Sequence, residues 1–77
     1  MNEARRKLIQ AAIDKIEEAK SDLETARDEE QEYYDNMPES LQSGDKGSTA
    51  EEAVSNLEDA INSADDAANS GNSALGG

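Results

Sequence analysis

The stretch Asp35-Asn-Met-Pro-Glu-Ser-Leu-Gln42 decides the fold, because it lies between two helix-patterned segments and combines a helix stop with a one-turn restart. Pro38 lacks an N–H and its ring clashes with a preceding helical turn, so a helix arriving from the N-terminus should end near Asn36. Asn36 is then expected to cap a new turn, with Pro38 early in it and Glu39 three residues on, as in a capping box. The stretch therefore predicts a helical hairpin with a corner at Pro38.

The segment before this corner has the composition and spacing of one long helix, over about residues 3–35. It is rich in Glu, Ala, Lys, Arg and Leu and contains no Gly or Pro. Its apolar residues recur at steps of three or four, which places them on one helix face. They are Ile9, Ile13, Ile16, Ala19, Leu23 and Ala26, with Leu8 and Ala12 widening the first half.

At the corner itself, a few larger apolar side chains are expected to gather. Tyr33, Met37 and Leu41 are predicted to form a small hydrophobic plug, and Tyr34 is expected to be more exposed. The predicted structural corner thus consists of Tyr33, Asn36, Met37, Pro38, Glu39 and Leu41.

After the corner, which we place at residues 36–48, the sequence predicts a second helix over about residues 49–69. Two Gly in Ser43-Gly-Asp-Lys-Gly47 indicate a turn, and Ser48 and Thr49 precede Glu51 and Glu52 at capping-box spacing. Apolar residues again recur at helical spacing, at Ala50, Ala53, Val54, Leu57, Ala60, Ile61, Ala64, Ala67 and Ala68. Residues 70–77 are Gly, Ser and Asn with one Ala and one Leu, so we expect a mobile tail.

Length and composition indicate one small all-α domain that needs help to build a core. The chain has 77 residues, 34% of them hydrophobic, with no Phe or Trp. A domain of this size buries a limited fraction of its surface, and self-association is the simplest way to enlarge the core. We therefore expect a two-helix antiparallel hairpin that self-associates into a helical bundle.

The composition also excludes several classes of function. The chain has no Cys and no His, which removes thiolate chemistry, the usual neutral-pH acid/base and the commonest transition-metal ligand. Paired carboxylates have no predicted pocket, the corner lacks the ligand pattern of a calcium-binding loop, and no phosphate-binding glycine loop occurs. The protein is thus expected to be no enzyme and to have no cofactor and no dedicated metal site.

The charge balance predicts the kind of partner. Asp and Glu number 19 against 7 Lys and Arg, for a net charge of -12. This charge disfavours direct contact with nucleic acid or an anionic membrane and favours a basic protein surface. No apolar run long enough for a membrane span and no secretory leader are seen, so a cytoplasmic location is expected.

The corner carries a family resemblance. The run Asp28-Glu-Glu-Gln-Glu-Tyr-Tyr-Asp-Asn-Met-Pro-Glu-Ser-Leu-Gln42, followed by a Gly-containing turn and Ala50-Glu-Glu-Ala-Val54, resembles small acidic proteins of bacteriophages and prophages. In those proteins a long charged helix leads into an Asp-Asn-Met/Ile-Pro-Glu-x-Leu-Gln corner and a second Ala/Glu-rich helix. The resemblance covers about residues 9–68 and its specific part is the corner. It implies a viral setting, in the cytoplasm of a host cell, and no catalytic residues.

Two functional hypotheses follow from these features. In the first, the protein modulates or inhibits a host protein, such as a nucleic-acid-handling or defence factor, by imitating nucleic-acid charge. Residues one helical turn apart repeat at about 5.4 Å, comparable to phosphate spacing along a strand. The predicted partner-binding residues are Glu29, Glu30, Glu32, Glu51, Glu52, Glu58, Asp59, Asp65 and Asp66. In the alternative, the chain is an oligomeric adaptor or assembly module whose acidity serves solubility.

Overall fold

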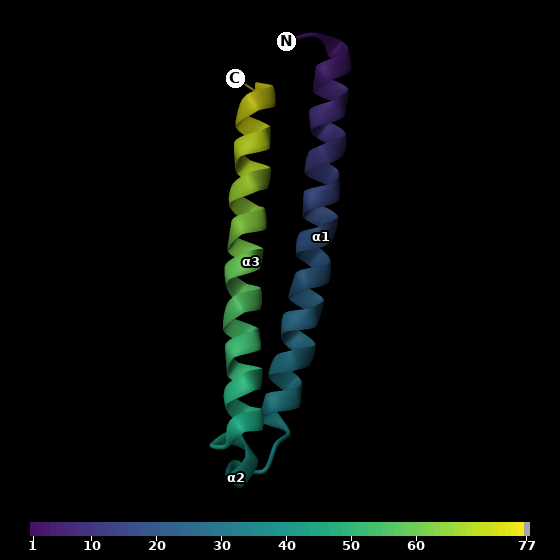
Figure 1. Cartoon of the computed structure of the whole chain (residues 1–77). Coiled ribbons are helices and arrows are strands. Elements are labelled where there is room, and N and C mark those ends of the chain that lie inside the picture. Colours follow the sequence, from purple (N-terminus) through teal and green to yellow (C-terminus); the bar gives the residue numbers. More distant parts are fainter. Residues whose placement is uncertain (77) are drawn as a thin grey trace.

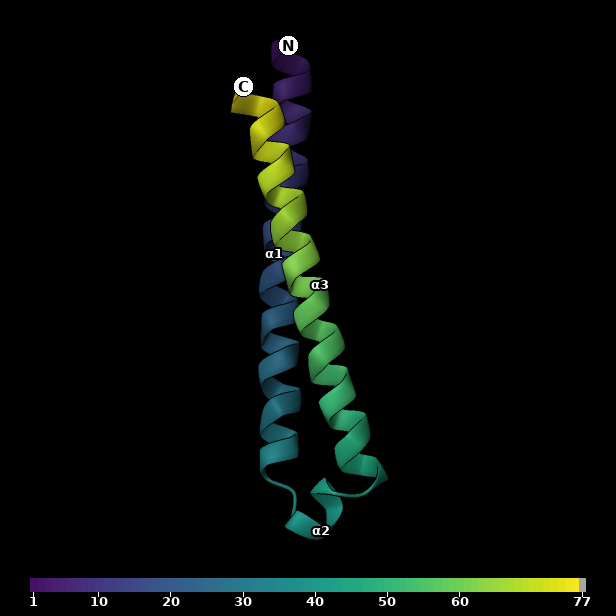
Figure 2. The same ribbon diagram turned by 90° about the vertical axis from the view of Figure 1, so that its left-hand side faces the viewer.

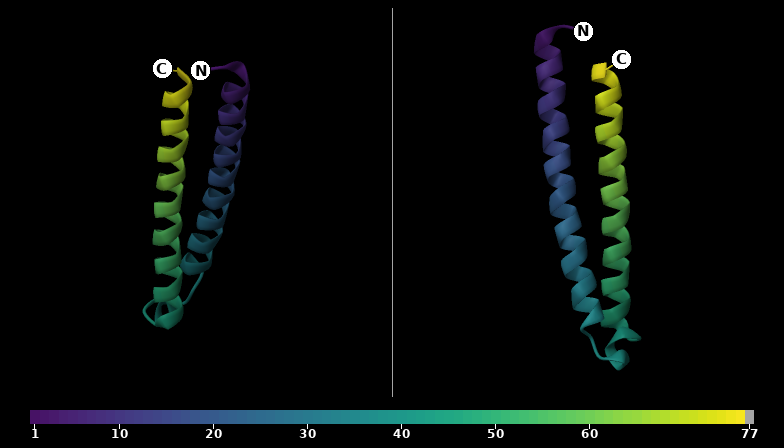
Figure 3. Two further views of the ribbon diagram at one scale, coloured as in Figure 1. Left: turned by 45° about the horizontal axis from the view of Figure 1, so that its top comes forward. Right: turned by 180° about the vertical axis from the view of Figure 1, so that it is seen from behind.

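The computed structural model describes residues 1–76, which form three helices and no strand: α1 (Glu3–Asp35), α2 (Glu39–Gln42) and α3 (Asp45–Gly76). The long helices α1 and α3 run antiparallel and side by side, with α2 at one end of the pair and both termini at the other (Figure 1). The views in Figure 2 and Figure 3 show the same arrangement from other sides. The molecule is a rod of 59 × 14 × 13 Å. The predicted all-helical hairpin is confirmed, with the restart present as a separate one-turn helix.

The ends of α1 satisfy their backbone groups locally. The Asn2 side chain caps the start by accepting a hydrogen bond of 2.8 Å from the Arg5 N–H. At the other end the Asn36 N–H donates to the Glu32 carbonyl, and the side-chain amide of Gln42 donates to the Tyr34 carbonyl at 3.0 Å. The side chain of Gln42 therefore covers the carbonyl end of α1 and ties the corner to it.

The corner differs from its prediction in two respects. Asn36 ends α1 and does not cap α2; the residue before α2 is Pro38, with no side-chain cap, and its carbonyl accepts from the N–H groups of Leu41 and Gln42. The predicted plug is also wrong, because Tyr33 and Leu41 are exposed, whereas Met37 and Tyr34 are half-buried. Successive residues on a helix point in different directions, and it is Tyr34, not Tyr33, that faces α3.

The second long helix is longer at both ends than the predicted 49–69. It begins at Asp45, a favourable acid in the first turn, and Ser48 donates to the Gly44 carbonyl rather than initiating the helix. It continues to Gly76 through most of the predicted mobile tail, of which residue 77 lies outside the described residues. Contacts with α1 explain the extension: Gly71 packs against Ile13, and Arg6 donates to the Leu75 carbonyl at 2.9 Å. Packing overrides the weak helical propensity of Gly, Ser and Asn.

A seven-residue repeat defines the contact between the long helices. Most of their buried and half-buried residues follow alternating steps of three and four, as in a coiled coil, and we label these core positions a and d of a heptad. In α1 and the residues after it they are Ile9, Ile13, Ile16, Lys20, Leu23, Arg27, Glu30, Tyr34 and Met37. In α3 they are Gly47, Ala50, Val54, Leu57, Ile61, Ala64, Ala68, Gly71 and Leu75.

This repeat corrects the predicted apolar face of α1. Ala19 and Ala26, and also Leu8 and Ala12, are exposed, and Lys20 and Arg27 occupy the core positions instead. Long basic side chains can lay their aliphatic stems along a core while their charged ends reach water. The middle of the hairpin core is therefore amphipathic, and the larger side chains buried among residues 1–76 are Ile13, Val54 and Ile61.

Candidate protein-binding surface

Six of the seven acids of α3 form a regular row along one side of the helix, and the seventh, Asp45, lies in its first turn. The six occur as adjacent pairs at heptad positions e and f, in three successive heptads: Glu51 and Glu52, Glu58 and Asp59, Asp65 and Asp66. All are exposed except Asp65, which is half-buried. Residues seven apart on a helix are separated by about 10.5 Å along its axis, which is two turns. The acidic pairs therefore repeat every two turns, and not every turn as the comparison with phosphate spacing assumed.

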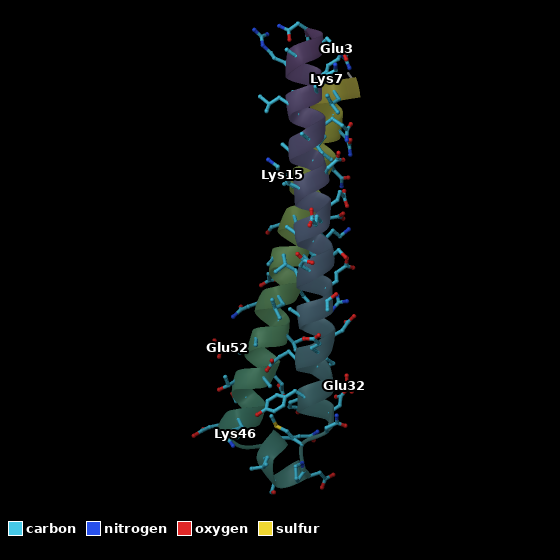
Figure 4. The ribbon with its side chains drawn as sticks, turned by 90° about the vertical axis from the view of Figure 1, so that its right-hand side faces the viewer. Glu3, Lys7, Lys15, Glu32, Lys46 and Glu52 are labelled. Carbon is cyan, nitrogen blue, oxygen red and sulfur yellow. The ribbon has the colours of Figure 1, made fainter. Side chains whose placement is uncertain are left out.

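The predicted acids of α1 do not join this row. Glu30 occupies a core position and lines a shallow recess near the corner together with Tyr33, Lys46 and Ala50. Glu32 projects from the edge of the rod opposite to Glu52 (Figure 4). Glu29, Glu30 and Glu32 sit at different heptad positions and therefore point in different directions. The structure thus brings the α3 acids together and leaves the α1 candidates dispersed.

Two acids of α1 that the sequence interpretation omitted lie beside the α3 row instead. Glu17 and Glu24 are close enough to Lys20 to affect its pKa, and Lys20 in turn contacts Asp65. Both occupy position e of α1, and in an antiparallel pair the e positions of the two helices share one side. Glu17 and Glu24 are seven residues apart, so a heptad assignment of the sequence would have placed both at position e.

One ion pair links the long helices within the described residues. The Lys20 Nζ lies 2.8 Å from the Asp65 Oδ1, so Asp65 is paired with a base of the other long helix. The hydrogen bond with Asp65 raises the pKa of Lys20, burial opposes this shift, and the charges of Asp65, Glu24 and Glu17 add to it. This contact places Lys20 of α1 at the level of Asp65 of α3.

A second contact between the helices involves Tyr34. A hydrogen bond with the Glu51 carboxylate raises the pKa of the Tyr34 phenol, and burial and the charges of Glu51 and Asp35 act in the same direction. Glu51 therefore has a contact within the hairpin, whereas Glu52, Glu58, Asp59 and Asp66 are exposed.

These two contacts predict that the hairpin loses stability in alkali. Both pKa values are raised on folding, so their stabilisation is complete below the ordinary values of 10.5 for Lys20 and 10.0 for Tyr34 and is lost as pH rises through the higher folded values. The thermal midpoint of unfolding should fall as pH rises above this range. Lys20→Arg, which stays charged in this range, should make the decrease of the midpoint with pH shallower. Tyr34→Phe, which removes the titrating phenol, should make this decrease shallower still.

The matched control for this measurement is Lys15→Arg, at an exposed lysine on the same helix. It should leave the slope of midpoint against pH as in the parent protein. Equal slopes for the parent and Lys20→Arg would contradict a role of the Lys20–Asp65 contact in folding.

The charge of the rod is concentrated toward the corner. Residues 20–60 hold 13 of the 19 acids and 3 of the 7 bases, whereas Arg5, Arg6, Lys7 and Lys15 lie toward the end with the termini. Within residues 1–76 no three carboxylates are grouped closely enough to hold a metal ion, and none of the helices is both long and apolar enough to cross a membrane. The main feature of this surface is therefore a large negative charge, carried on α3 by regularly spaced pairs of acids.

Comparison with known proteins gave no match to a family model, to a curated protein or to a solved structure.

Proposed function

We propose that this protein is a non-enzymatic binding module that occupies a basic surface on another protein. The observation that supports this best is the row of acids on α3, backed by the negative charge of the corner half of the rod. A basic protein surface releases its bound anions or nucleic acid to a competing polyanion, and opposite charge accelerates the encounter. The resemblance at the corner adds a viral or prophage setting and a host factor that handles nucleic acid, or a defence factor, in the cytoplasm as the target.

We propose a smaller set of contact residues than the nine acids predicted from the sequence. Glu52, Glu58, Asp59 and Asp66 are exposed on one helix, and Glu51 and Asp65 flank them with one contact each to α1. Glu29, Glu30 and Glu32 are a secondary set, because they do not share a side with the row.

A competition experiment tests this proposal. The probe is a labelled DNA duplex held by a small basic DNA-binding protein without sequence preference, and this protein is added as competitor. The triple variant Glu52→Gln, Glu58→Gln, Asp59→Asn should release the duplex about tenfold less effectively, because close charge pairs at interfaces contribute on the order of 1.5 kcal/mol or more. Glu51 is kept because it contacts Tyr34.

The matched control removes the same charge from α1, with Asp14→Asn, Glu18→Gln and Asp22→Asn, all at exposed positions. It should compete nearly as well as the parent protein. Competition that is unchanged between low and moderate salt, or that both triple variants lose equally, would count against a specific acidic surface on α3.

A second candidate function is an oligomeric adaptor or assembly module. It is favoured by an observation independent of the acids: one side of the hairpin carries Ala at every heptad of both long helices between Ala12 and Ala26 and between Ala53 and Ala74. In this case neutralising the α3 row would leave binding intact, and disrupting self-association would abolish it.

A further inference from the structure

One side of the hairpin, which we call the alanine flank, is uncharged and unpartnered along most of its length. Its residues occupy position g of the heptads in both long helices. They are Ala12, Ala19 and Ala26 of α1 and Ala53, Ala60, Ala67 and Ala74 of α3. Ala53 and Ala60 are half-buried and the others are exposed. The next g residues toward the corner, Tyr33 and Lys46, line one recess, so the g positions of the two helices share one side of the rod.

The border of the alanine flank on α3 is also free of charge. Position c, which lies next to g around the helix, is occupied by Thr49, Asn56, Ser63 and Ser70. The opposite side of the hairpin, by contrast, carries Glu17 and Glu24 of α1 and Glu51, Glu58 and Asp65 of α3 at position e. Position e thus carries these five acids, whereas position g carries no charge between Ala12 and Ala26 or between Ala53 and Ala74.

Larger apolar side chains stand at the two ends of this flank. Leu8, at position c near the start of α1, is 71% exposed, and Tyr33, at position g near the corner, is 52% exposed. From Gly47 onward the a, d and g positions of α3 carry only Gly, Ala, Val, Leu and Ile, which is the pattern of a helix that contacts more than one neighbour in a bundle. In α1 the g positions between Ala12 and Ala26 are Ala, although its core positions also include charged residues. In a lone hairpin each long helix has only one long neighbour, and few large side chains are buried. Such a core is small for a domain of this size.

We infer that two copies of this chain pack through their alanine flanks as an antiparallel four-helix bundle. This inference deepens the self-association named as the second candidate function. Small side chains allow the helices of two rods to approach closely, and a two-fold axis across the middle of the rods makes the contact self-complementary.

The distribution of charge selects the antiparallel arrangement. With the rods antiparallel, the corner half of one copy, which holds 13 of the 19 acids, lies beside the less acidic terminal half of the other, which holds 6 acids and 4 of the 7 bases. On the borders of the flank, Lys15 of one copy then approaches the part of the other that carries Asp22 and Glu29. Lys15 projects from one edge of the rod in Figure 4, away from Glu32 on the opposite edge. A parallel arrangement would place the two acidic halves together.

The same arrangement also pairs the apolar ends of the flank. Tyr33 near the corner of one copy meets the start of α1 in the other, where Leu8 and Arg5 lie. An aromatic ring can pack against an aliphatic side chain and accept a guanidinium group on its face. Both of these exposed apolar residues are therefore covered in the dimer.

The molar mass in solution tests the dimer. The parent protein should have twice the 8.2 kDa mass of the chain in analytical ultracentrifugation at micromolar concentration. Ala19→Glu puts a charged side chain in the middle of the flank and should reduce the mass to that of one chain. Ala11→Glu makes the same change at an exposed position on the outer side of α1 and should leave the dimer intact.

Helicity measured by circular dichroism shows whether the variants fold, because both replace an exposed Ala with a good helix former. A parent protein that stays monomeric up to millimolar concentration would overturn the inference. So would a dimer that Ala11→Glu and Ala19→Glu weaken equally.

The arrangement of the copies has its own test, because the chain contains no Cys. Ala19→Cys lies near the middle of α1, so in the antiparallel bundle two copies should form a disulfide-linked dimer under mild oxidation. Ala11→Cys should not cross-link. Equal cross-linking of both, or none from Ala19→Cys in a sample that is dimeric by mass, would contradict antiparallel packing through this flank. Neither measurement involves a basic target, so the failure of the acidic-surface proposal would leave these results unaffected.

Discussion

Gly47→Ala is expected to destabilise the hairpin by about 3 kcal/mol, toward the upper end of the cost of overpacking a tightly packed site. Gly47 is buried in the first turns of α3, where the backbone of Gln42 crosses it. A Cβ placed on Gly47 would overlap the carbonyl carbon, carbonyl oxygen and Cα of Gln42, closer than real Cβ contacts allow. Because these are backbone atoms, α2 must move away from α3 to relieve the overlap. Chemical denaturation followed by circular dichroism measures the loss.

The predicted loss of unfolding free energy in Gly47→Ala is opposite in sign to the effect expected from helical propensity. Replacing a helical Gly with Ala at an open position stabilises a helix by roughly 0.5–1 kcal/mol. The matched control is Gly44→Ala, three residues earlier, where a Cβ would make ordinary contacts of 3.6 Å with the carbonyls of Leu41 and Ser40. Gly44→Ala should change the unfolding free energy little. A stable Gly47→Ala variant would show that the close crossing of Gln42 is not needed for the corner.

Much of the hairpin could be predicted from the sequence because its signals are local. Pro38 ends a helix for steric reasons that do not depend on the rest of the fold, and the apolar spacing of Ile9, Ile13 and Ile16 identifies the correct face. The same approach failed at Lys20 and Arg27, because it counted apolar residues and assigned the next places to Ala19 and Ala26. Which residues face α3 depends on the pairing of two helices, which the residues of one helix do not show.

The end of α3 illustrates the same limit. Gly, Ser and Asn have weak helical propensity, and from the local sequence they indicate a tail. They are helical because α1 is long enough to provide Ile13 and Arg6 as contacts at that level. The candidate surface could be predicted only in part, for a similar reason. The six acids of the α3 row are visible in the local sequence, whereas the contacts of Asp65 with Lys20 and of Glu51 with Tyr34 depend on the pairing of the two helices.

Ile61→Asp is expected to unfold the hairpin, and this is the largest effect we predict. Ile61 is buried at a core position of α3, 7% exposed, and the pairing of Lys20 with Asp65 brings Leu23 of α1 to its level. Loss of a buried Ile side chain alone costs about 2–5 kcal/mol, and an unpaired carboxylate in its place adds a desolvation cost. The neighbouring bases at core positions of α1, Lys20 and Arg27, already pair with Asp65 and Asp28.

The control for this variant lies at the next residue. Asn62→Asp adds the same charge to the same turn of α3, but at an exposed position. It should retain the helical circular dichroism signal and a thermal transition close to that of the parent protein, whereas Ile61→Asp should lose both. If the two variants lost helicity equally, the cause would be the added negative charge on an already acidic helix. Destabilisation by Ile61→Asp alone would instead identify the contact between α1 and α3 as the source of stability, because Ile61 is buried in that contact and Asn62 is exposed.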